Sequence, residues 1–468
     1  MLVLRPLLSA LLICLMPTGA WASAVAEDGC VSPTGMDLVG HPAGWLCLLI
    51  FFASYAAVFA EEYTHMKKSK PVMLGASLIW VVVAFVAPAH GVGHESLRSA
   101  VLHGLEEYAS LLLFLLSAMT YIAALLNRGV FDVLKDRLIR AGLGYRGLFW
   151  ATGVLAFFLS PIADNLTTAL VLGAVVVVAG VASPHFVAIA CVNVVNAANA
   201  GGAFSPFGDI TTLMVWQAGR VDFLEFFVLF FPSLACFLVP ATIMQFWVPR
   251  GRPDVPSMPA QMRRGARAII VLGLLTISMA VGFEQALGLP PFVGMMAGLS
   301  LLMIATYIIT HGDGRPLGDR RRGGMFDVFD LVAESEWDTL FFFFGVIFSV
   351  GGLAYIGYLE VASEAIYGTL GFSWGNIVLG LVSAAVDNIP VMFAVLSMNP
   401  PLDHFQWLLI TLATGVGGSL VSIGSAAGVA LMGVARGRYG FMTHLRWTPV
   451  LLLGYAAAMT THFLVNGP

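Results

Sequence analysis

The sequence predicts an all-α polytopic membrane protein made of inverted-topology repeats, each with a re-entrant helical hairpin and an interrupted transmembrane helix. Three observations predict this class. The composition, 59% hydrophobic and 11% charged, is typical of a chain whose solvent is mostly lipid. Two Ser-x-x-x-Asp-Asn runs, at residues 160–165 and 383–388, lie inside apolar sequence, one in each half of the chain. The Lys and Arg residues gather in only some of the connecting loops.

The N-terminal segment is predicted to be a secretory signal, which we assign to residues 1–24. Arg5 is followed by the apolar run 6–16 and by the small residues Ala22 and Ala24, the order found in cleaved signals. The alternative is an uncleaved anchor helix. Either one places the start of the next region, the N-terminal helices of residues 25–105, outside the cytoplasm.

Uncharged stretches near spanning length predict most of the transmembrane helices. They lie at residues 44–60, 71–89, 108–127, 223–248, 268–283, 291–310, 339–357, 404–433 and 447–464. All but three of the 23 Lys and Arg residues fall in loops on one side of the resulting topology, the exceptions being Arg5, Arg98 and Arg220. The positive-inside rule makes those loops cytoplasmic, so the mature N- and C-termini are expected in the periplasm of a bacterium with the protein in its inner membrane.

The basic loops all lie on one side of the membrane only if the segments 147–181 and 374–398 re-enter the membrane instead of crossing it. Each is an apolar run interrupted by an Asp-Asn pair, and its arms of about 10–16 residues are short for a full crossing. The first follows the basic stretch 128–146, whereas the second lies between loops without Lys or Arg. The two hairpins are therefore predicted to have opposite orientations.

The two halves of the chain share three landmarks at similar spacing. The offset is 223 residues from Asp164 to Asp387, 216 from the block 201–209 to the block 417–425, and 229 from Glu107 to Glu336. We assign repeat 1 to residues 106–248, with a hairpin at 147–181 and a broken helix at 184–219. Residues 249–334 form connecting helices and basic cytoplasmic loops. Repeat 2 covers residues 335–468, with a hairpin at 374–398, a broken helix at 404–433 and a final helix at 447–464.

Inverted repeats of this kind are typical of secondary transporters, which bind their substrate near the midplane where discontinuous helices meet. The candidate cation and proton ligands are Asp164, Asn165, Thr167, Thr168, Asn199, Asp209, Thr211, Thr212, Ser383, Asp387, Asn388, Ser422 and Ser425. Such oxygen ligands suit a hard cation, so we expect Na⁺ in the region of Asp164, Asp209 and Asp387. Because desolvation and like charge also favour protonated carboxyls, protons compete with Na⁺ for these oxygens.

Simpler roles are open for several of these residues. Asn165 and Asn388 could serve only to cap the second hairpin arms, the hydroxyls could bond to their own backbone, and Asn199 could pack helices. Glu107 and Glu336 are either proton relays or solvated helix ends.

We expect no Lys or Arg to be buried beside the three aspartates, which would leave an acidic site that suits an anion poorly.

Four segments carry a resemblance to a known family: residues 160–170, 199–216, 386–396 and 418–433 resemble the NhaD-type sodium/proton antiporters of the ion transporter superfamily. The resemblance implies electrogenic exchange of Na⁺ or Li⁺ for H⁺ across a bacterial inner membrane, with a role in pH homeostasis and with no cofactor besides the transported ions. It also implies the two-repeat fold and leaves a homodimer open, because several members are dimers. The candidate residues within the four segments, with Ser383 just before the third, match the family's motif. Glu107, Glu336 and Glu284 match less distinctively.

Two other classes of function compete with the antiporter. A Na⁺-coupled carboxylate symporter would resemble relatives with Ser-Asn-Thr at both hairpin tips, whereas an Asp-Asn tip repels an anion at low dielectric. An intramembrane aspartyl protease could use Asp164 and Asp387 as a proton-sharing dyad. Residues 207–209 lack the Gly-x-Gly-Asp form expected there, and the repeat would have no explanation. We therefore predict a transporter and no enzyme, with Na⁺, Li⁺, H⁺ and the lipid bilayer as partners and no nucleic acid.

Overall fold

The computed structural model describes residues 35–64, 66–253, 260–311 and 328–467. Within these ranges the regular elements are all helices, without a β-strand, and nine of the helices are long and apolar enough to cross a membrane. The chain is thus a multi-pass membrane protein, and the predicted all-α fold class with inverted repeats is confirmed. The predicted signal of residues 1–24 lies outside the described residues.

The first repeat contains a hairpin and a broken helix in direct succession. Its helices are α5 (His94–Asn127), α6 (Val130–Arg140), α7 (Tyr145–Ala163), α8 (Asn165–Ala179), α9 (Pro184–Gly202), α10 (Ile210–Gln217), η2 (Glu225–Leu229), α11 (Phe230–Met244) and η3 (Gln245–Trp247). Asp164 separates the two arms of the hairpin, and its carboxylate caps α8. Ser183 caps α9, which has Pro184 as its first residue, and both residue types favour a helix start.

The second repeat has the same order of elements. They are α16 (Trp337–Tyr355), α17 (Tyr358–Ser363), η4 (Glu364–Gly368), α18 (Thr369–Val386), α19 (Asn388–Met398), α20 (His404–Gly417), η5 (Ser422–Gly424), α21 (Ala426–Val434), α22 (Phe441–Leu445) and α23 (Thr448–Asn466). Asp387 occupies the position of Asp164 at the hairpin tip and caps α19. Thus α18 and α19 form the second hairpin, and α20 and α21 the second broken helix.

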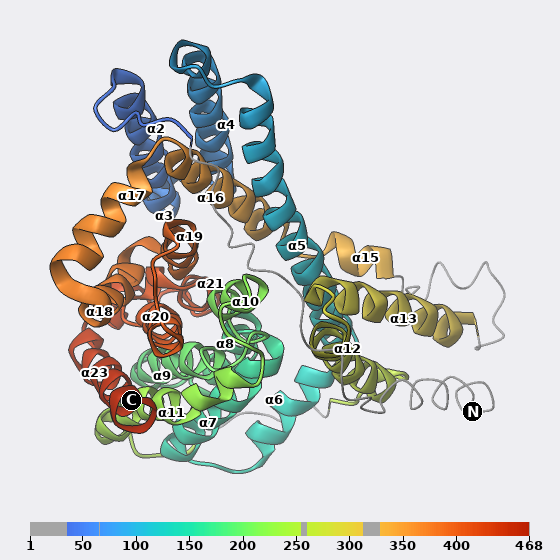
Figure 1. Ribbon diagram of the computed structural model, residues 1–468. Helices are drawn as coiled ribbons and strands as arrows, with labels where there is room; N and C mark the ends of the chain where they lie inside the picture. Colours follow the sequence, from blue (N-terminus) through green and yellow to red (C-terminus); the bar gives the residue numbers. More distant parts are fainter. Residues whose placement is uncertain (1–34, 65, 254–259, 312–327, 468) are drawn as a thin grey trace.

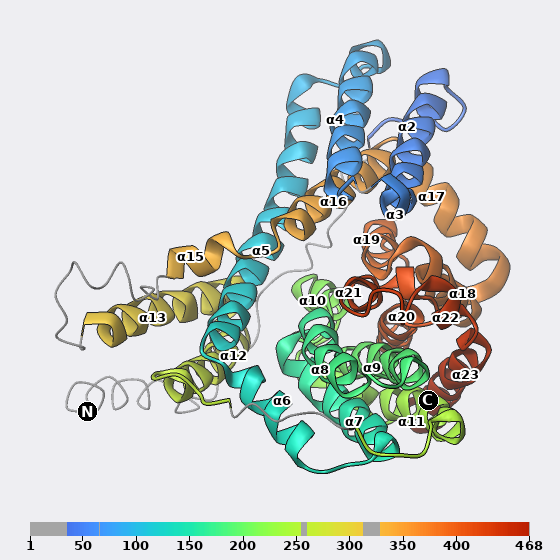
Figure 2. The ribbon, with the colours of Figure 1, turned by 180° about the vertical axis from the view of Figure 1, so that it is seen from behind.

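The remaining helices form two pairs beside the repeats (Figures 1 and 2). The pairs are α2 (Pro42–Phe59) with α4 (Ser69–Val86), and α12 (Ala266–Leu287) with α13 (Pro291–His311); the short elements α3 (Glu61–Thr64), η1 (Ala87–His90) and α15 (Val328–Ala333) adjoin them. The first pair packs against α16 of the second repeat, and the second pair packs against α5 of the first repeat. The helix pair that precedes the first repeat in the chain therefore packs on the second repeat, and the pair that precedes the second repeat packs on the first. We call this arrangement the exchange of helix pairs.

The hairpins and broken helices pack together in a symmetric pattern. Within each repeat the first hairpin arm lies against the first half of the broken helix, as α7 on α9 and α18 on α20. Between repeats the second arm lies against the second half of the other broken helix, as α8 on α21 and α19 on α10. Both hairpin tips and both helix breaks therefore belong to one region, which we call the polar centre.

Glycines permit the close approach of the helix breaks to the hairpins. A Cβ atom on Gly201 would lie 2.2 Å from the carbonyl oxygen of Phe157 in α7, and one on Gly417 would lie 2.0 Å from that of Gly380 in α18. Matching serines strengthen the same contacts, because Ser160 donates to the Ala198 carbonyl and Ser383 to the Thr414 carbonyl, at 2.6 and 3.2 Å. No larger side chain fits at either glycine without moving backbone.

Candidate cation-binding site

The two hairpin tips place a carboxylate at the start of a buried helix. Asp164 has a φ of 56° and Asp387 a φ of 80°, with ψ of 163° and 145°, a backbone region that residues other than glycine rarely enter. Asp164 accepts hydrogen bonds from the backbone N–H and the hydroxyl of Thr167, at 2.7 and 3.0 Å. Asp387 Oδ1 accepts from the N–H of Asn388 at 2.8 Å. Both carboxylates are therefore oriented by the helix that they cap.

The second halves of the broken helices start in the same way. Asp209 has extended backbone and accepts from the N–H of Thr211 at 3.2 Å as α10 begins. Ser425 has nearly the same φ and ψ and accepts from the N–H of Gly428 at 3.3 Å as α21 begins. Equivalent capping positions thus carry a carboxylate in the first repeat and a hydroxyl in the second, which makes the first repeat the more acidic of the two.

Asparagines join the tips to the breaks across the two repeats. The amide of Asn388 donates to both carboxylate oxygens of Asp209, at 3.3 and 3.1 Å. The amide of Asn165 donates to Asn199 at 3.2 Å, and Asn199 in turn donates to Ser425 at 3.1 Å. All of these groups are buried. The structure therefore joins Asn388 to Asp209, and joins Asn165 through Asn199 to Ser425.

The hydroxyls of the predicted set divide into two groups. Thr168, Thr211, Thr212 and Ser422 are fully buried at the polar centre, and within the described residues their hydroxyls have no hydrogen-bond partner. An unsatisfied buried hydroxyl costs about 1–3 kcal/mol, so these oxygens are available to a bound ion. In contrast, Ser383 donates to the carbonyls of Gly380 and Thr414, and the Thr167 hydroxyl is used by Asp164. Those two side chains position the hairpins.

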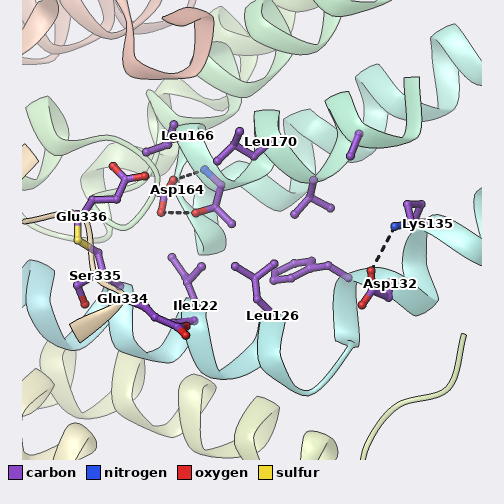
Figure 3. Close-up of a pocket in the computed structure, with 16 residues that line it drawn as sticks. Ile122, Leu126, Asp132, Lys135, Asp164, Leu166, Leu170, Glu334, Ser335 and Glu336 are labelled. Carbon is purple, nitrogen blue, oxygen red and sulfur yellow. Dashed lines mark hydrogen bonds and ion pairs between the residues drawn. The ribbon is translucent and has the colours of Figure 1, made fainter. Parts of the chain in front are cut away.

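A cavity of about 320 Å³ lies between α5, α6 and α8 and leads to Asp164 (Figure 3). Figure 3 shows Asp164 and Glu336 at one end of the cavity and the ion pair of Asp132 and Lys135 at the other. Apolar residues of α5 and α8, including Leu126, line the space between. Glu334 also lines the acidic end, beside Glu336, and the sequence did not indicate it because its surroundings have no distinctive pattern.

Glu107 and Glu336, which the internal repeat predicts to be equivalent, have different surroundings in the structure. Glu336 lies before the first turn of α16, lines the cavity beside Asp164 and accepts from the hydroxyl of Thr339 at 3.1 Å. Glu107 lies within α5 and faces His103 on the same helix, with Oε1 3.6 Å from Nε2. Met119 is the nearest cavity-lining residue on that helix, a rise of about 18 Å away. Of these two glutamates, only Glu336 lines the cavity that reaches Asp164.

A partly buried cation accompanies Asp387, which the sequence did not predict. The ammonium of Lys68 lies 3.5 Å from Asp387 Oδ2, and the two side chains are only 18% and 15% exposed. The sequence placed Lys68 in a basic cytoplasmic loop with Lys67 and Lys70, because it precedes an apolar helix. Its partner is 319 residues away in the chain, a distance at which no local pattern connects two residues. Lys68 is thus part of the site that the sequence missed.

Comparisons with known proteins agree with this architecture. The family described as "Citrate transporter", CitMHS, matches residues 3–417. The chain is 51% identical to the Na⁺/H⁺ antiporter NhaD of Vibrio cholerae serotype O1, over 92% of this chain and 94% of that protein. It is 48% identical to the Na⁺/H⁺ antiporter NhaD of Alkalimonas amylolytica, over 98% and 96%, and 31% identical to sodium/proton antiporter 1 of Arabidopsis thaliana, over 89% and 72%.

Among solved structures, the Alcanivorax borkumensis YdaH transporter is similar with a TM-score of 0.46 and 15% identity, covering 80% of this chain and 90% of that one. The fold, its polar centre and the sequence relatives define a membrane transporter of the ion transporter superfamily and not an enzyme. The chain belongs to the family matched above and, within it, to the NhaD-type sodium/proton antiporters.

Proposed function

We propose that this protein exchanges Na⁺, and also Li⁺, for H⁺ through the polar centre. Relatives that share about half of their residues with it over almost the whole length are named Na⁺/H⁺ antiporters. The polar centre supplies the groups that such exchange needs, namely carboxylates that bind either a proton or a metal ion, and neutral oxygens that complete the coordination of a hard cation.

The environment of Asp209 gives the strongest support for cation exchange. Its carboxylate is 4% exposed and receives hydrogen bonds from two neutral donors, the Asn388 amide and the Thr211 N–H. Among the described residues no Lys or Arg forms an ion pair with it. A buried carboxylate without a cationic partner is costly in lipid. Na⁺ and H⁺ are the two partners that remove this cost, and only one of them binds at a time.

A glycine lies beside the same carboxylate. Gly415 in α20 occupies the position that Asn199 has in α9, and a Cβ on Gly415 would lie 3.5 Å from Asp209 Oδ2. The missing side chain leaves that oxygen uncovered on one side. The buried hydroxyl of Thr212, which has no partner in the described part of the chain, follows in the first turn of α10. Together they supply oxygen ligands of the type that Na⁺ prefers.

The cavity beside α8 supports a path for protons and cations to Asp164. Glu336 at its acidic end is the relay that we favour, whereas Glu107 is too distant along α5. The Asp132–Lys135 pair at the other end belongs to a basic stretch that we place on the cytoplasmic side. We accordingly propose an inner-membrane location, with the mature termini in the periplasm and this cavity open to the cytoplasm.

A carboxylate symporter is the function that the family description would suggest instead. An anion at the polar centre would meet the charge of Asp209 and Asp164, for which the described residues provide no ion-pair partner. Two like charges about 4 Å apart at an effective dielectric of 20 repel by about 4 kcal/mol. Exchange of cations avoids this repulsion, so it is the function that the arrangement supports better.

The test compares wild type with Asp209→Asn in everted membrane vesicles, by dequenching of a pH-sensitive dye after NaCl, LiCl or KCl is added at pH 6–10. We expect a response to Na⁺ and Li⁺ in wild type and a rate at least about tenfold lower in Asp209→Asn, because losing even an outer partner of a metal ligand typically costs about 10–100-fold in affinity or activity. Asp222→Asn, which changes an exposed aspartate, is the matched control and should keep the wild-type rate.

Full activity of Asp209→Asn would overturn the role of this carboxylate. Na⁺-dependent uptake of labelled citrate or succinate into proteoliposomes, without Na⁺-driven proton movement in vesicles, would decide for the symporter.

A further inference from the structure

Lys68 is held by helices other than the hairpin whose carboxylate it faces. It directly precedes α4, and its ammonium lies 4.3 Å from the ring centroid of Phe342 in α16, within the range of a cation–π contact. Ser69, the next residue, donates its hydroxyl to Asp338 in the first turn of α16. Farther along the two helices, the indole of Trp80 donates to the Phe348 carbonyl at 2.8 Å. Lys68 is therefore attached to the α4–α16 pair.

The two hairpin tips differ in a way that explains why Lys68 is needed at one of them. At the first tip, Thr167 gives Asp164 both a backbone N–H and a hydroxyl. Three residues after Asp387 the chain has Pro390, which has neither an N–H nor a hydroxyl to donate. Asp387 Oδ2 therefore lacks the bonds that its counterpart has, and the ammonium of Lys68 occupies that side of the carboxylate.

Through Asp387 the charge of Lys68 is connected to the polar centre. Asp387 Oδ1 accepts from the N–H of Asn388, and the Asn388 amide donates to both oxygens of Asp209. Lys68 also acts electrostatically on Glu61 and Glu336, so its positive charge is shared among several acids. A shared, partly exposed ammonium can leave one carboxylate at a modest cost.

We propose that Lys68 is a displaceable counter-cation of Asp387, which occupies this carboxylate while the polar centre holds no metal ion and leaves it when Na⁺ binds. Lys68 then competes with the transported cation for the second hairpin tip. It is a positioning residue that sets the Na⁺ affinity and links cation binding to the contact between the second hairpin and the α4–α16 pair. This inference rests on the proposed cation exchange and assigns the residue that tunes it.

The test obtains the Na⁺ concentration at half-occupancy (the midpoint) of the purified full-length protein at pH 9 by fitting the rise of Tm with Na⁺ concentration, because a ligand of the folded state stabilises it by RT ln(1 + [Na⁺]/Kd). For Lys68→Gln we expect this midpoint to fall about three- to tenfold, since partly exposed ion pairs have couplings of that order. Lys68→Arg keeps the charge and should keep the midpoint. Lys70→Gln is the matched control, since it removes an exposed ammonium two residues away.

Lys68→Met provides a second measurement if Lys68→Gln does not fold, because its apolar side chain still covers Phe342. In the Asp387→Asn background the change caused by Lys68→Gln should disappear, since the competition requires the carboxylate. A merely structural lysine would lower Tm and leave the Na⁺ midpoint unchanged, and that result would overturn the inference. If the wild-type protein shows no Na⁺-driven exchange, the proposed function fails, independently of Lys68.

Discussion

At the scale of residues, the aspartates of the hairpin tips combine a chemical and a backbone role. Asp164 and Asp387 adopt positive φ with ψ of 163° and 145°, a conformation that costs about 1–3 kcal/mol in a residue with a side chain. Each recovers part of this cost by capping the following helix. Each carboxylate is thus held in place although its backbone is strained. Such strain is typical of sites where the side chain is needed for function.

We predict that substitutions of Asp164 will separate these two roles. Asp164→Gly relieves the backbone strain, whereas Asp164→Ala retains it, and both remove the cap and the charge. Asp164→Ala should therefore be less stable than Asp164→Gly by roughly 1–2 kcal/mol, although both lose exchange. Thermal unfolding of the purified variants in detergent measures the difference. Equal stability of the two variants would show that this tip is unstrained.

At the scale of residues, the sequence indicated the aspartates and asparagines of the polar centre but not Lys68. The Asp-Asn pairs and Asp209 stood out because charge and amide groups are rare inside apolar runs. Lys68 did not, since a lysine before an apolar helix is ordinary on the cytoplasmic side. Its pairing with Asp387 arises from tertiary packing. The same packing decides that Glu336 lines the cavity and Glu107 does not, because α5 begins 13 residues before Glu107 whereas α16 begins one residue after Glu336.

At the scale of elements, the helix breaks are the feature that the sequence indicated most directly. Glycines at 201–202 and 208, with their counterparts at 417–418 and 424, marked the interruptions. In the structure Gly202 and Gly208 face each other, and so do Gly418 and Gly424, since a Cβ on the first of each pair would lie 2.6 Å from the carbonyl oxygen of the second. The glycines thus allow each break to fold tightly on itself and against its hairpin.

We predict that a single methyl group at either hairpin contact will disrupt the protein. Gly201→Ala and Gly417→Ala each place a Cβ against a backbone carbonyl, and overpacking of this kind costs about 1–3 kcal/mol or more. Both variants should show lower Tm and strongly reduced exchange. Gly433→Ala in α21 is the matched control, because the space around Gly433 is open. A normal Gly417→Ala protein would contradict the close hairpin contact of the second repeat.

At the scale of the whole molecule, the exchange of helix pairs binds the two repeats into one unit. The α2–α4 pair of the first half packs on α16, and the α12–α13 pair packs on α5. Polar contacts fix these interfaces, since Tyr121 and Ser117 of α5 donate to carbonyls of α13 at 2.7 and 2.8 Å. The sequence could not predict this exchange, because each of these helices has a long apolar stretch and nothing in that stretch indicates its partner.

We predict that the two halves of the chain will not accumulate when they are expressed separately. A split between η3 and α12 leaves α5 without α13 and α16 without α4, and polar groups without partners are costly in lipid. Co-expression of both halves should restore Na⁺-driven exchange. As a control, a split within residues 312–327 leaves α5 and α13 on one fragment, which should accumulate better alone. Stable, separate halves would contradict the exchanged packing.

The exchange of helix pairs also means that α5 is synthesised well before α13, the helix that it packs against. The α5 helix ends at Asn127 and its partner α13 ends at His311, so 184 residues are synthesised in between. At a translation rate of about 5–20 residues per second this takes roughly 9–37 s. During that interval α5 is already in the membrane while the helix that accepts its polar groups does not yet exist. The hydroxyls of Ser117 and Tyr121 therefore have no acceptor in α13 until that helix has been synthesised.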